Sequence, residues 1–577
     1  MDTQKLVLFL IFSTSLLFLW DAWQKEQMAP SPASNATQGA AREAGAPPKE
    51  DMPIKEDMPI PGEKLATAQP GSGPASSDGT VPVKAGNLQT GEKITVKTDL
   101  VSAEIDTAGG DLRRLELLNH PDKEDRSKPF ALLQARQGHV YIAQSGLIGD
   151  SLPNHKTRYT ADSESYALQA GQDKVEVRLA GPEVDNVRVT KIYTFRRGSY
   201  VIDVSFEVAN GGAAAIQPFS YFQMLRDSPP PVGSFFMVPT YTGAALYTEQ
   251  EKFKKIEFSA LDKGTASYPK NADNGWIAML QHYFLTAWLP KEKTQREFYA
   301  KRLGENEYTA GVIVPVGVIE PGGTTRVTVP LYAGPEEQSK LAEVAPGLDL
   351  TVDYGWLTVI GAPLFWLLSL FQSWTGNWGV AIILLTMSVK LAFFPLSAAG
   401  YRSMAKLRLV TPKLQRLREQ HGNDRERMHQ AMMEFYKTEK INPMGGCLPI
   451  LVQIPVFISL YWVLLASVEL RYAPFALWIE DLSSPDPYYI LPVMMAISMF
   501  VQTKLSPPAT DPIQQKVMQI MPFAFAVFFF FFPAGLVLYS LVNNVLSIAQ
   551  QWQITRMIER SAAPSGAAGK KKDSVKS

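Results

Sequence analysis

Long apolar runs lie at the two ends of the chain, and the region between them alternates between apolar and polar residues. The first run, Leu6–Trp20, has the length of a signal-peptide core or of a short membrane anchor. No small-residue cleavage pattern follows it, and Trp23 suits a membrane interface. We predict an uncleaved signal-anchor span over residues 1–21, with a cleaved signal peptide as the alternative.

Residues 22–90 and 91–345 predict a flexible linker followed by an all-β domain. The linker is rich in Pro, Ala, Ser and Gly, and no aromatic residue occurs between Gln24 and Leu100. Such a segment cannot bury enough apolar area to offset its chain entropy. Period-two alternation then begins, as in Lys174–Leu179, with Gly, Asn and Pro turns between the runs. Many short strands of this kind indicate a large β-sandwich.

Beyond Asp353 apolar segments dominate again. Residues 353–374 contain several Trp and Phe residues and no Lys or Arg, and they predict an interfacial helix along the membrane, with a span as the alternative. Region 375–560 predicts a helical membrane core, with spans near 378–396, 448–467, 489–503, 517–532 and 534–548. Prolines interrupt several of these segments, so neighbouring helices must satisfy the freed carbonyls and the spans should pack as a bundle. With the N-terminal anchor, six spans are predicted.

Charge in the loops predicts the orientation. Residues 401–442 contain ten Lys or Arg and five acidic residues in a pattern typical of a helical hairpin, and the tail, residues 561–577, contains four Lys. Residues 469–487, in contrast, contain Arg471 as their one basic residue and four acidic residues. The hairpin, the tail and both termini are therefore expected in the cytoplasm, and the β-domain on the other side.

Composition removes several classes of function. The 577 residues carry 56 Lys or Arg and 56 Asp or Glu, so no overall basic field points to nucleic acid. A single cysteine excludes an intrachain disulfide and a Cys-rich zinc site. The six histidines form no metalloprotease motif, and the sequence has no P-loop, nucleophile elbow or dinucleotide fingerprint. We expect no catalytic residue, no metal and no cofactor.

Lys390 is the main functional candidate, because it is the one charged residue of an apolar predicted span. An ammonium group at that depth costs at least a few kcal/mol unless it faces water or a partner. The other four spans of the core contain no acidic residue. This indicates a water-filled cavity open to the cytoplasm, and a lysine that extends to the inner headgroups is the alternative.

Polar residues of the same spans fit such a cavity. Thr386 precedes Lys390 by one helical turn and shares its face. Gln453 and Ser540 supply polar groups from other spans, although each alone is more typical of a hydrogen bond between helices.

The hairpin carries basic residues, including Arg402 and Lys406, and methionines, including Met432 and Met433. Adaptable methionine side chains suit varied apolar partners, with helix packing as the alternative. The basic tail suits anionic lipid or ribosomal RNA, or serves only to fix the topology.

Several motifs of the C-terminal part occur in the order found in a known family. They are Gly376–Gly379, Phe394–Leu396, Ser403–Lys406, Glu439–Pro449, Pro474–Trp478, Asp486–Pro492, Asp511–Lys516 and Phe532–Tyr539. Over about Asp353–Arg560 the chain closely resembles the YidC membrane-protein insertase family (YidC/Oxa/Alb). The N-terminal anchor and the β-domain resemble its Gram-negative form, whose periplasmic domain is a β-supersandwich similar to galactose-mutarotase folds.

The resemblance implies a non-enzymatic insertase and chaperone of the bacterial inner membrane. Family members insert, fold and assemble inner-membrane proteins, alone or with the Sec translocon, through a hydrophilic groove open to the cytoplasm and to lipid. Lys390 matches the position of the family's groove arginine, and it keeps the charge without the bidentate fork. Thr386 matches a polar groove position, and Tyr539 with Ser540 matches a Tyr-Tyr pair.

The implied partners are nascent inner-membrane proteins, the Sec translocon, membrane lipids and, through the basic tail and cytoplasmic loops, the ribosome. Two other classes remain possible from the residues. A transporter or channel fits a lone intramembrane charge and predicts solute flux in liposomes. A carbohydrate-binding periplasmic protein rests on fold analogy alone and predicts sugar binding by the β-domain.

Overall fold

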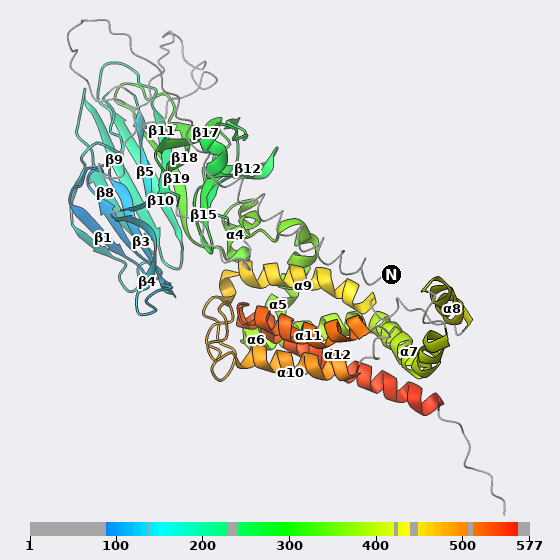
Figure 1. Ribbon diagram of the computed structural model, residues 1–577. Coiled ribbons are helices and arrows are strands. Elements are labelled where there is room, and N and C mark those ends of the chain that lie inside the picture. The colour runs from blue at the N-terminus through cyan, green and yellow to red at the C-terminus, as the bar shows by residue number, and fades with distance from the viewer. Residues whose placement is uncertain are drawn as a thin grey trace, which may run out of the picture. The chain divides into compact units, whose positions relative to one another are not determined.

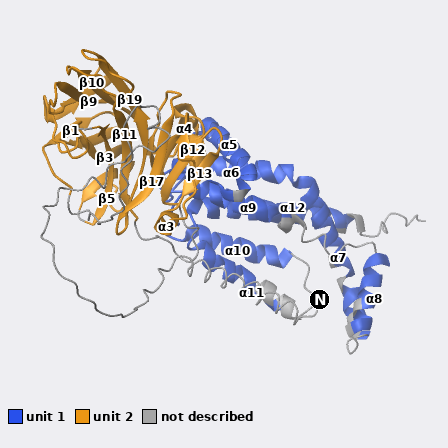
Figure 2. Cartoon of the chain, turned by 90° about the horizontal axis from the view of Figure 1, so that it is seen from above, with its two compact units in different colours: residues 1–6, 352–577 blue, residues 7–351 orange. Residues whose placement is uncertain are grey.

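The computed structural model describes residues 88–136, 138–149, 151–228, 241–420, 425–438, 448–505 and 512–562. The described chain falls into two compact units, one ending at Thr351 and one beginning at Val352 (Figure 2). The predicted N-terminal anchor, nearly all of the predicted linker and most of the basic tail lie outside the described residues.

The first unit contains two antiparallel sheets in the described residues. The ten-stranded sheet has the order β14-β17-β18-β11-β5-β4-β3-β2-β1-β7, in which the edge pair β1–β7 is parallel. Its strands are β1 (Lys93–Lys97), β2 (Val101–Asp106), β3 (Asp111–Pro121), β4 (Pro129–Arg136), β5 (His139–Ile148), β7 (Ser165–Ala167), β11 (Phe219–Asp227), β14 (Asn271–Ala272), β17 (Arg296–Gly304) and β18 (Glu307–Pro315).

The second sheet has nine strands within the described residues, in the order β13-β12-β15-β16-β19-β10-β9-β8-β6. They are β6 (Thr160–Ala161), β8 (Lys174–Ala180), β9 (Val187–Arg196), β10 (Val201–Asn210), β12 (Gly243–Thr248), β13 (Lys252–Ile256), β15 (Trp276–Gln281), β16 (Phe284–Trp288) and β19 (Thr324–Pro335). The short helices α3 (Phe258–Asp262) and α4 (Gln338–Val344) and the 3₁₀ turn η2 (Leu348–Thr351) complete the unit.

The two sheets pack face to face, and the predicted β-sandwich is confirmed (Figure 1). Aromatic rings of the two sheets are in contact. The ring centroid of Phe206 on β10 lies 5.9 Å from that of Phe222 on β11, and the Phe222 centroid lies 5.1 Å from that of Trp288 on β16. All three are buried, as alternation of inward apolar and outward polar residues requires.

A polar cluster lies in the same interior. Lys191 of β9 is fully buried, and its Nζ donates to the carbonyl oxygens of Gly109, at 3.1 Å, and Ser145, at 3.0 Å. Gly109 belongs to the turn between β2 and β3 and has φ +83, which a side chain would strain. Asp111, at the start of β3, is also fully buried and accepts a hydrogen bond from Gln144 at 3.0 Å. Lys191 therefore joins one sheet to a turn and a strand of the other.

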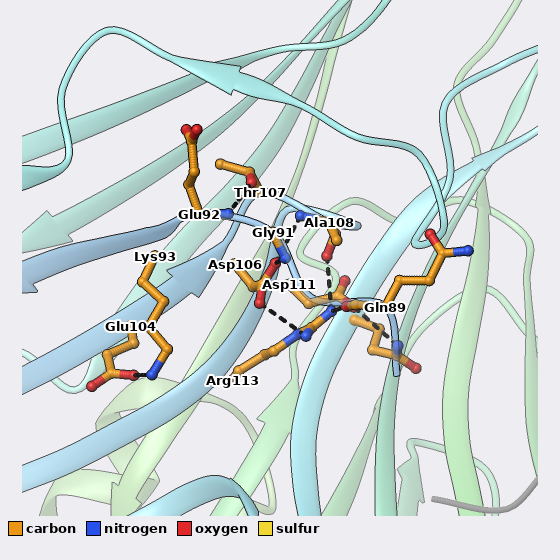
Figure 3. A network of polar contacts seen from close by, with 11 residues as sticks. Gln89, Gly91, Glu92, Lys93, Glu104, Asp106, Thr107, Ala108, Asp111 and Arg113 are labelled. Atoms are coloured by element: carbon orange, nitrogen blue, oxygen red, sulfur yellow. Dashed lines mark hydrogen bonds and ion pairs between the residues drawn. The ribbon is translucent and has the colours of Figure 1, made fainter. Parts of the chain in front are cut away.

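The first described residues are hydrogen-bonded to β2 and β3 of the ten-stranded sheet (Figure 3). Asp106 Oδ1 accepts from the backbone N–H of Gly91 at 2.8 Å, and Arg113 Nη2 donates to the carbonyl of Gln89 at 2.7 Å. Arg113 also pairs with Asp106 Oδ2 at 2.9 Å, and both side chains are mostly buried. The ion-paired side chains thus hold Gln89 and Gly91 against β2 and β3, beside the boundary predicted at residue 91.

The second unit is helical (Figure 1). Its helices are α5 (Thr358–Thr375), α6 (Trp378–Ala392), α7 (Phe394–Gln420), α8 (Arg425–Thr438), α9 (Leu448–Ala466), α10 (Ile490–Leu505), α11 (Pro512–Phe529) and α12 (Ala534–Ala562), with 3₁₀ turns η3 (Gly355–Leu357) and η5 (Val468–Leu470). Figure 1 shows α7 and α8 at one end of a bundle formed by the other helices.

In the described residues, the apolar helices are short for membrane spans. There, no single helix of at least 18 residues is apolar enough to qualify as a membrane span by length and composition. One bent pair qualifies, α6 with the first half of α7, and three shorter apolar helices cover Val452–Ala466, Ile490–Leu505 and Ile520–Phe529. The count of six spans stays a prediction.

The segment predicted as one span over 378–396 is broken. α6 ends at Ala392, and α7 begins at Phe394 after a bend of 67°. Pro395 explains the break, because proline has no N–H to donate and its ring clashes with the carbonyl four residues earlier, so it fits only the first turn of a new helix. The first helix of the hairpin therefore begins at Phe394 and not near residue 401.

The motif Gly376–Gly379 covers the connection from α5 to the start of α6. Gly376, with φ +66, ends α5 in the left-handed conformation. Asn377 caps α6: its Oδ1 accepts from the Val380 N–H at 3.1 Å, and its Nδ2 donates to the Phe475 carbonyl at 2.8 Å. Gly379 then lies directly against the Phe475 ring. The motif thus fixes α6 to the loop that follows α9.

Gly379→Ala is expected to destabilise the helical unit by about 1–3 kcal/mol, because the added methyl overlaps the Phe475 ring and lies 2.7 Å from Phe475 Cβ. The midpoint of thermal unfolding of the detergent-solubilised protein measures the effect. Gly361→Ala on α5 is the matched control, since its methyl comes no closer than 3.2 Å to Tyr354. Equal midpoints for the two variants would contradict the contact.

Candidate functional site

Lys390 lies in the last turn of α6, half-buried among the helices. Its Nζ donates to the hydroxyl of Ser547 on α12 at 2.7 Å, and that hydroxyl donates to the Asn543 carbonyl at 2.7 Å. Within the described residues the hydrogen-bond partner of the ammonium group is thus a neutral hydroxyl of another helix. The lysine side chain is directed into the bundle by this contact.

Thr386 and Ser540, two predicted groove residues, are both buried. Thr386 Oγ1 donates to the Ile382 carbonyl at 2.7 Å, and Ser540 Oγ donates to the Leu536 carbonyl at 2.8 Å. Each hydroxyl proton is therefore used within its own helix, which leaves the oxygen lone pairs as the groups that could meet a further donor.

Gln453 and Tyr539 are brought together by the fold. Gln453 Nε2 on α9 donates to the Tyr539 hydroxyl on α12 at 2.6 Å, and Tyr539 is almost fully buried. Tyr539 precedes Ser547 by eight residues, which corresponds to about 12 Å along the helix. The predicted residues thus form two polar contacts with α12 at different levels of the bundle.

Helix α12 carries a stripe of four buried polar residues that sequence reasoning recognised only in part: Ser540, Asn544, Ser547 and Gln551. Asn544 Nδ2 donates to Ser498 Oγ on α10 at 2.8 Å, and Gln551 Nε2 donates to the Leu505 carbonyl at 3.1 Å. The spacing of three and four residues places the stripe on one face. That periodicity was the signal that could have identified Ser547 and Gln551.

The hairpin residues fall into two groups. Arg402 and Lys406 are exposed on α7, and Met433 on α8 is 44% exposed. Met432 instead packs against Val410 and Leu414 of α7, together with neighbouring aromatic residues. Met433 is therefore accessible to a partner, whereas Met432 holds the two hairpin helices together.

The loop between α9 and α10 is organised by a buried carboxylate. Asp486 accepts from Trp478 Nε1 at 3.0 Å and from the backbone N–H groups of Tyr488, at 3.0 Å, and Leu491, at 2.7 Å. Trp478 and Asp486 belong to two different motifs of the sequence, and this hydrogen bond joins them. The loop thereby sets where α10 begins.

Comparison with known proteins covers both units. Residues 93–367 match the family described as the YidC periplasmic domain, and residues 370–561 match the family described as the 60Kd inner membrane protein. A crystal structure of an active YidC insertase with its first transmembrane domain resolved covers 80% of this chain and 92% of its own, at 18% identity and a TM-score of 0.39.

Relatives align over almost the whole chain. A protein from Nitrosospira multiformis named membrane protein insertase YidC is 78% identical, and the alignment covers 98% of each chain. A protein of the same name from Nitrosomonas europaea is 63% identical over 96% of this chain and 91% of that protein. The chain belongs to the YidC family of membrane protein insertases, a family of the bacterial inner membrane with a periplasmic β-domain.

Proposed function

We propose that the chain inserts its clients through a hydrophilic groove around Lys390, open to the cytoplasm and to lipid. The observation that carries the proposal is the hydrogen bond from Lys390 Nζ to the neutral Ser547 hydroxyl inside the bundle. A cation held there by a neutral group is available to an anionic group of a client. The buried polar stripe of α12, to which Ser547 belongs, supports a polar interior next to Lys390.

The groove lowers the barrier for the polar part of a client. A charged side chain at the centre of a bilayer costs about 2.5–3.5 kcal/mol on insertion scales. Contact with Lys390 and the polar groups of α12 offsets part of this cost while a terminus or loop crosses. Transfer of the client's apolar segment into lipid supplies the driving free energy, so no nucleotide is required.

Exposed apolar side chains supply a path for that segment. They recur at helical spacing on α10 and α11: Val493, Met494, Ile497, Phe500, Ile520, Phe523 and Val527. A soluble surface rarely exposes so many large apolar residues together, whereas lipid and an apolar client segment both match them. Helix α5, with Trp366 66% exposed, fits an interfacial position.

The proposed topology has six spans, with both termini in the cytoplasm. The basic residues of the hairpin and tail against the acidic loop between α9 and α10 support it. In this arrangement the exposed Arg402, Lys406 and Met433 face the ribosome or the client, and the basic tail meets ribosomal RNA or anionic lipid. Cooperation with the Sec translocon and a chaperone role in folding and assembly belong to the same proposal.

The test is photo-cross-linking to ribosome-bound nascent clients of increasing length. A benzoylphenylalanine at Tyr539, which replaces one aromatic residue by another, is expected to cross-link to successive positions of a single-span client as the chain lengthens. The same probe at Tyr166 on β7 is the control and is expected to give no such series. Absence of adducts at Tyr539 at every length, in a protein that still folds, would contradict the groove.

A further inference from the structure

Ser547 forms two hydrogen bonds inside the helix bundle, one to Lys390 of α6 and one within α12. Its oxygen accepts from Lys390 Nζ at 2.7 Å, and its proton goes to the Asn543 carbonyl at 2.7 Å. A serine hydroxyl has one proton to donate and two lone pairs. The proton and one lone pair are occupied, so the hydroxyl joins the end of α6 to α12.

Lys390 lies near the exposed end of α6, where its side chain could point either out of the bundle or into it. Lys390 is two residues from the end of α6, and the exposed side chains of Leu391, Phe393 and Phe394 surround that end. A lysine stem there is long enough to carry its ammonium group out towards lipid headgroups. The hydrogen bond to Ser547 directs it into the bundle instead.

Neighbouring residues of α7 and α12 hold the helix around Ser547 in place. Tyr401 is buried, and it packs with Ala398 of α7 against Ile554 of α12. Asn544 precedes Ser547 by about one helical turn, and Gln551 follows it by about one turn. Both of these residues form hydrogen bonds with α10. Helix α12 is thereby bonded to α10 on both sides of Ser547, which fixes the place of the hydroxyl in the bundle.

We infer that Ser547 is a positioning residue, which holds the Lys390 ammonium group inside the groove and so sets the preference for clients with acidic translocated tails. This inference rests on the proposed role of Lys390. A neutral hydroxyl suits it, because a client carboxylate replaces the hydroxyl with a stronger, charge-assisted hydrogen bond. A carboxylate at residue 547 instead would hold the lysine permanently.

The experiment compares insertion of two clients that differ only in an acidic or a neutral tail, at matched expression. Ser547→Ala is expected to lower the ratio of acidic-tail to neutral-tail insertion by about threefold to tenfold, the range of one hydrogen bond between membrane helices. Ser547→Thr keeps the acceptor and is expected to retain the wild-type ratio. Ser547→Asp is expected to lower the ratio as Ser547→Ala does.

The matched control is Ser459→Ala on α9, since Ser459 is fully buried and donates to the Pro455 carbonyl of its own helix at 2.8 Å. It is expected to leave the ratio unchanged. If Lys390→Ala lowers the ratio and Ser547→Ala does not, the positioning role is overturned. If Lys390→Ala also has no effect, the proposed role of Lys390 is what fails.

A second measurement does not depend on insertion. The rate at which a water-soluble amine-reactive ester modifies Lys390, followed by mass spectrometry of the solubilised protein, reports where the ammonium group lies. Ser547→Ala is expected to raise this rate several-fold, because the group moves to the interface, whereas Ser547→Thr and Ser459→Ala are expected to match wild type. An unchanged rate in Ser547→Ala would overturn the inference even where that variant inserts both clients poorly.

Discussion

Lys390→Ala is expected to reduce insertion of clients with acidic translocated tails by about tenfold, with little effect on clients with neutral tails. One hydrogen bond to a charged group contributes about 1.5–3 kcal/mol, and about 1.4 kcal/mol corresponds to a factor of ten in rate. The variant removes the cation that lies half-buried against Ser547, and no other helix supplies one at that contact within the described residues. The rate of insertion is measured as protease protection of the translocated tail over time, at matched expression.

Lys390→Arg is the conservative control. It keeps the charge and adds a planar fork with more donors, so acidic-tail insertion should stay near wild type. Lys390→Glu reverses the charge and should fall below Lys390→Ala for acidic tails. Equal insertion of acidic tails by wild type and Lys390→Ala would remove the charge from the mechanism and leave the lysine as a structural contact of α12.

Lys191→Met is expected to destabilise the β-domain by about 3 kcal/mol at neutral pH. Methionine has a similar length, but it leaves the Gly109 and Ser145 carbonyls without the lysine donor and removes the attraction of the Lys191 ammonium group for the buried Asp111. Removal of one partner from a buried charged cluster costs about 3–5 kcal/mol. Urea unfolding of the fragment covering residues 88–351 measures the free energy.

Exposed Lys174 of β8 supplies the matched control. Its side chain is 61% exposed and pairs with Glu176 on the surface, so Lys174→Met should change stability by less than about 1 kcal/mol. A Lys191→Met fragment as stable as the Lys174→Met fragment would show that the interior tolerates the loss of the ammonium group.

The same lysine predicts a dependence on pH. Burial lowers the pKa of Lys191 to about 8, and Asp111 opposes this shift. Between that pKa and the unfolded value of 10.5, the unfolded chain binds a proton that the folded chain does not, so the contribution of Lys191 to stability rises with pH. The stability difference between wild type and Lys191→Met should therefore widen from pH 7 to about pH 9.5. A constant difference would contradict the assignment.

Much of the fold follows from local pattern. Period-two alternation predicted the β-sandwich and even places Lys191 on the inward face, in register with Val189 and Tyr193. The glycine and asparagine of the α5–α6 connection act through φ angles and capping bonds within a few residues. Pro395 was visible as well, and its missing N–H and its ring, overlooked in the prediction of one continuous span, end α6 before Phe393.

The sequence by itself determined where strands and apolar helices form, that the chain joins a β-domain to a membrane part, and that Lys390 is the charge requiring a partner. Only the tertiary structure decided that this partner is Ser547, 157 residues away, and that Gly109 and Ser145 receive Lys191. Capping and alternation depend on neighbouring residues, whose geometry the backbone fixes. A hydrogen bond between distant helices depends on the packing of every element between them, which no local pattern contains.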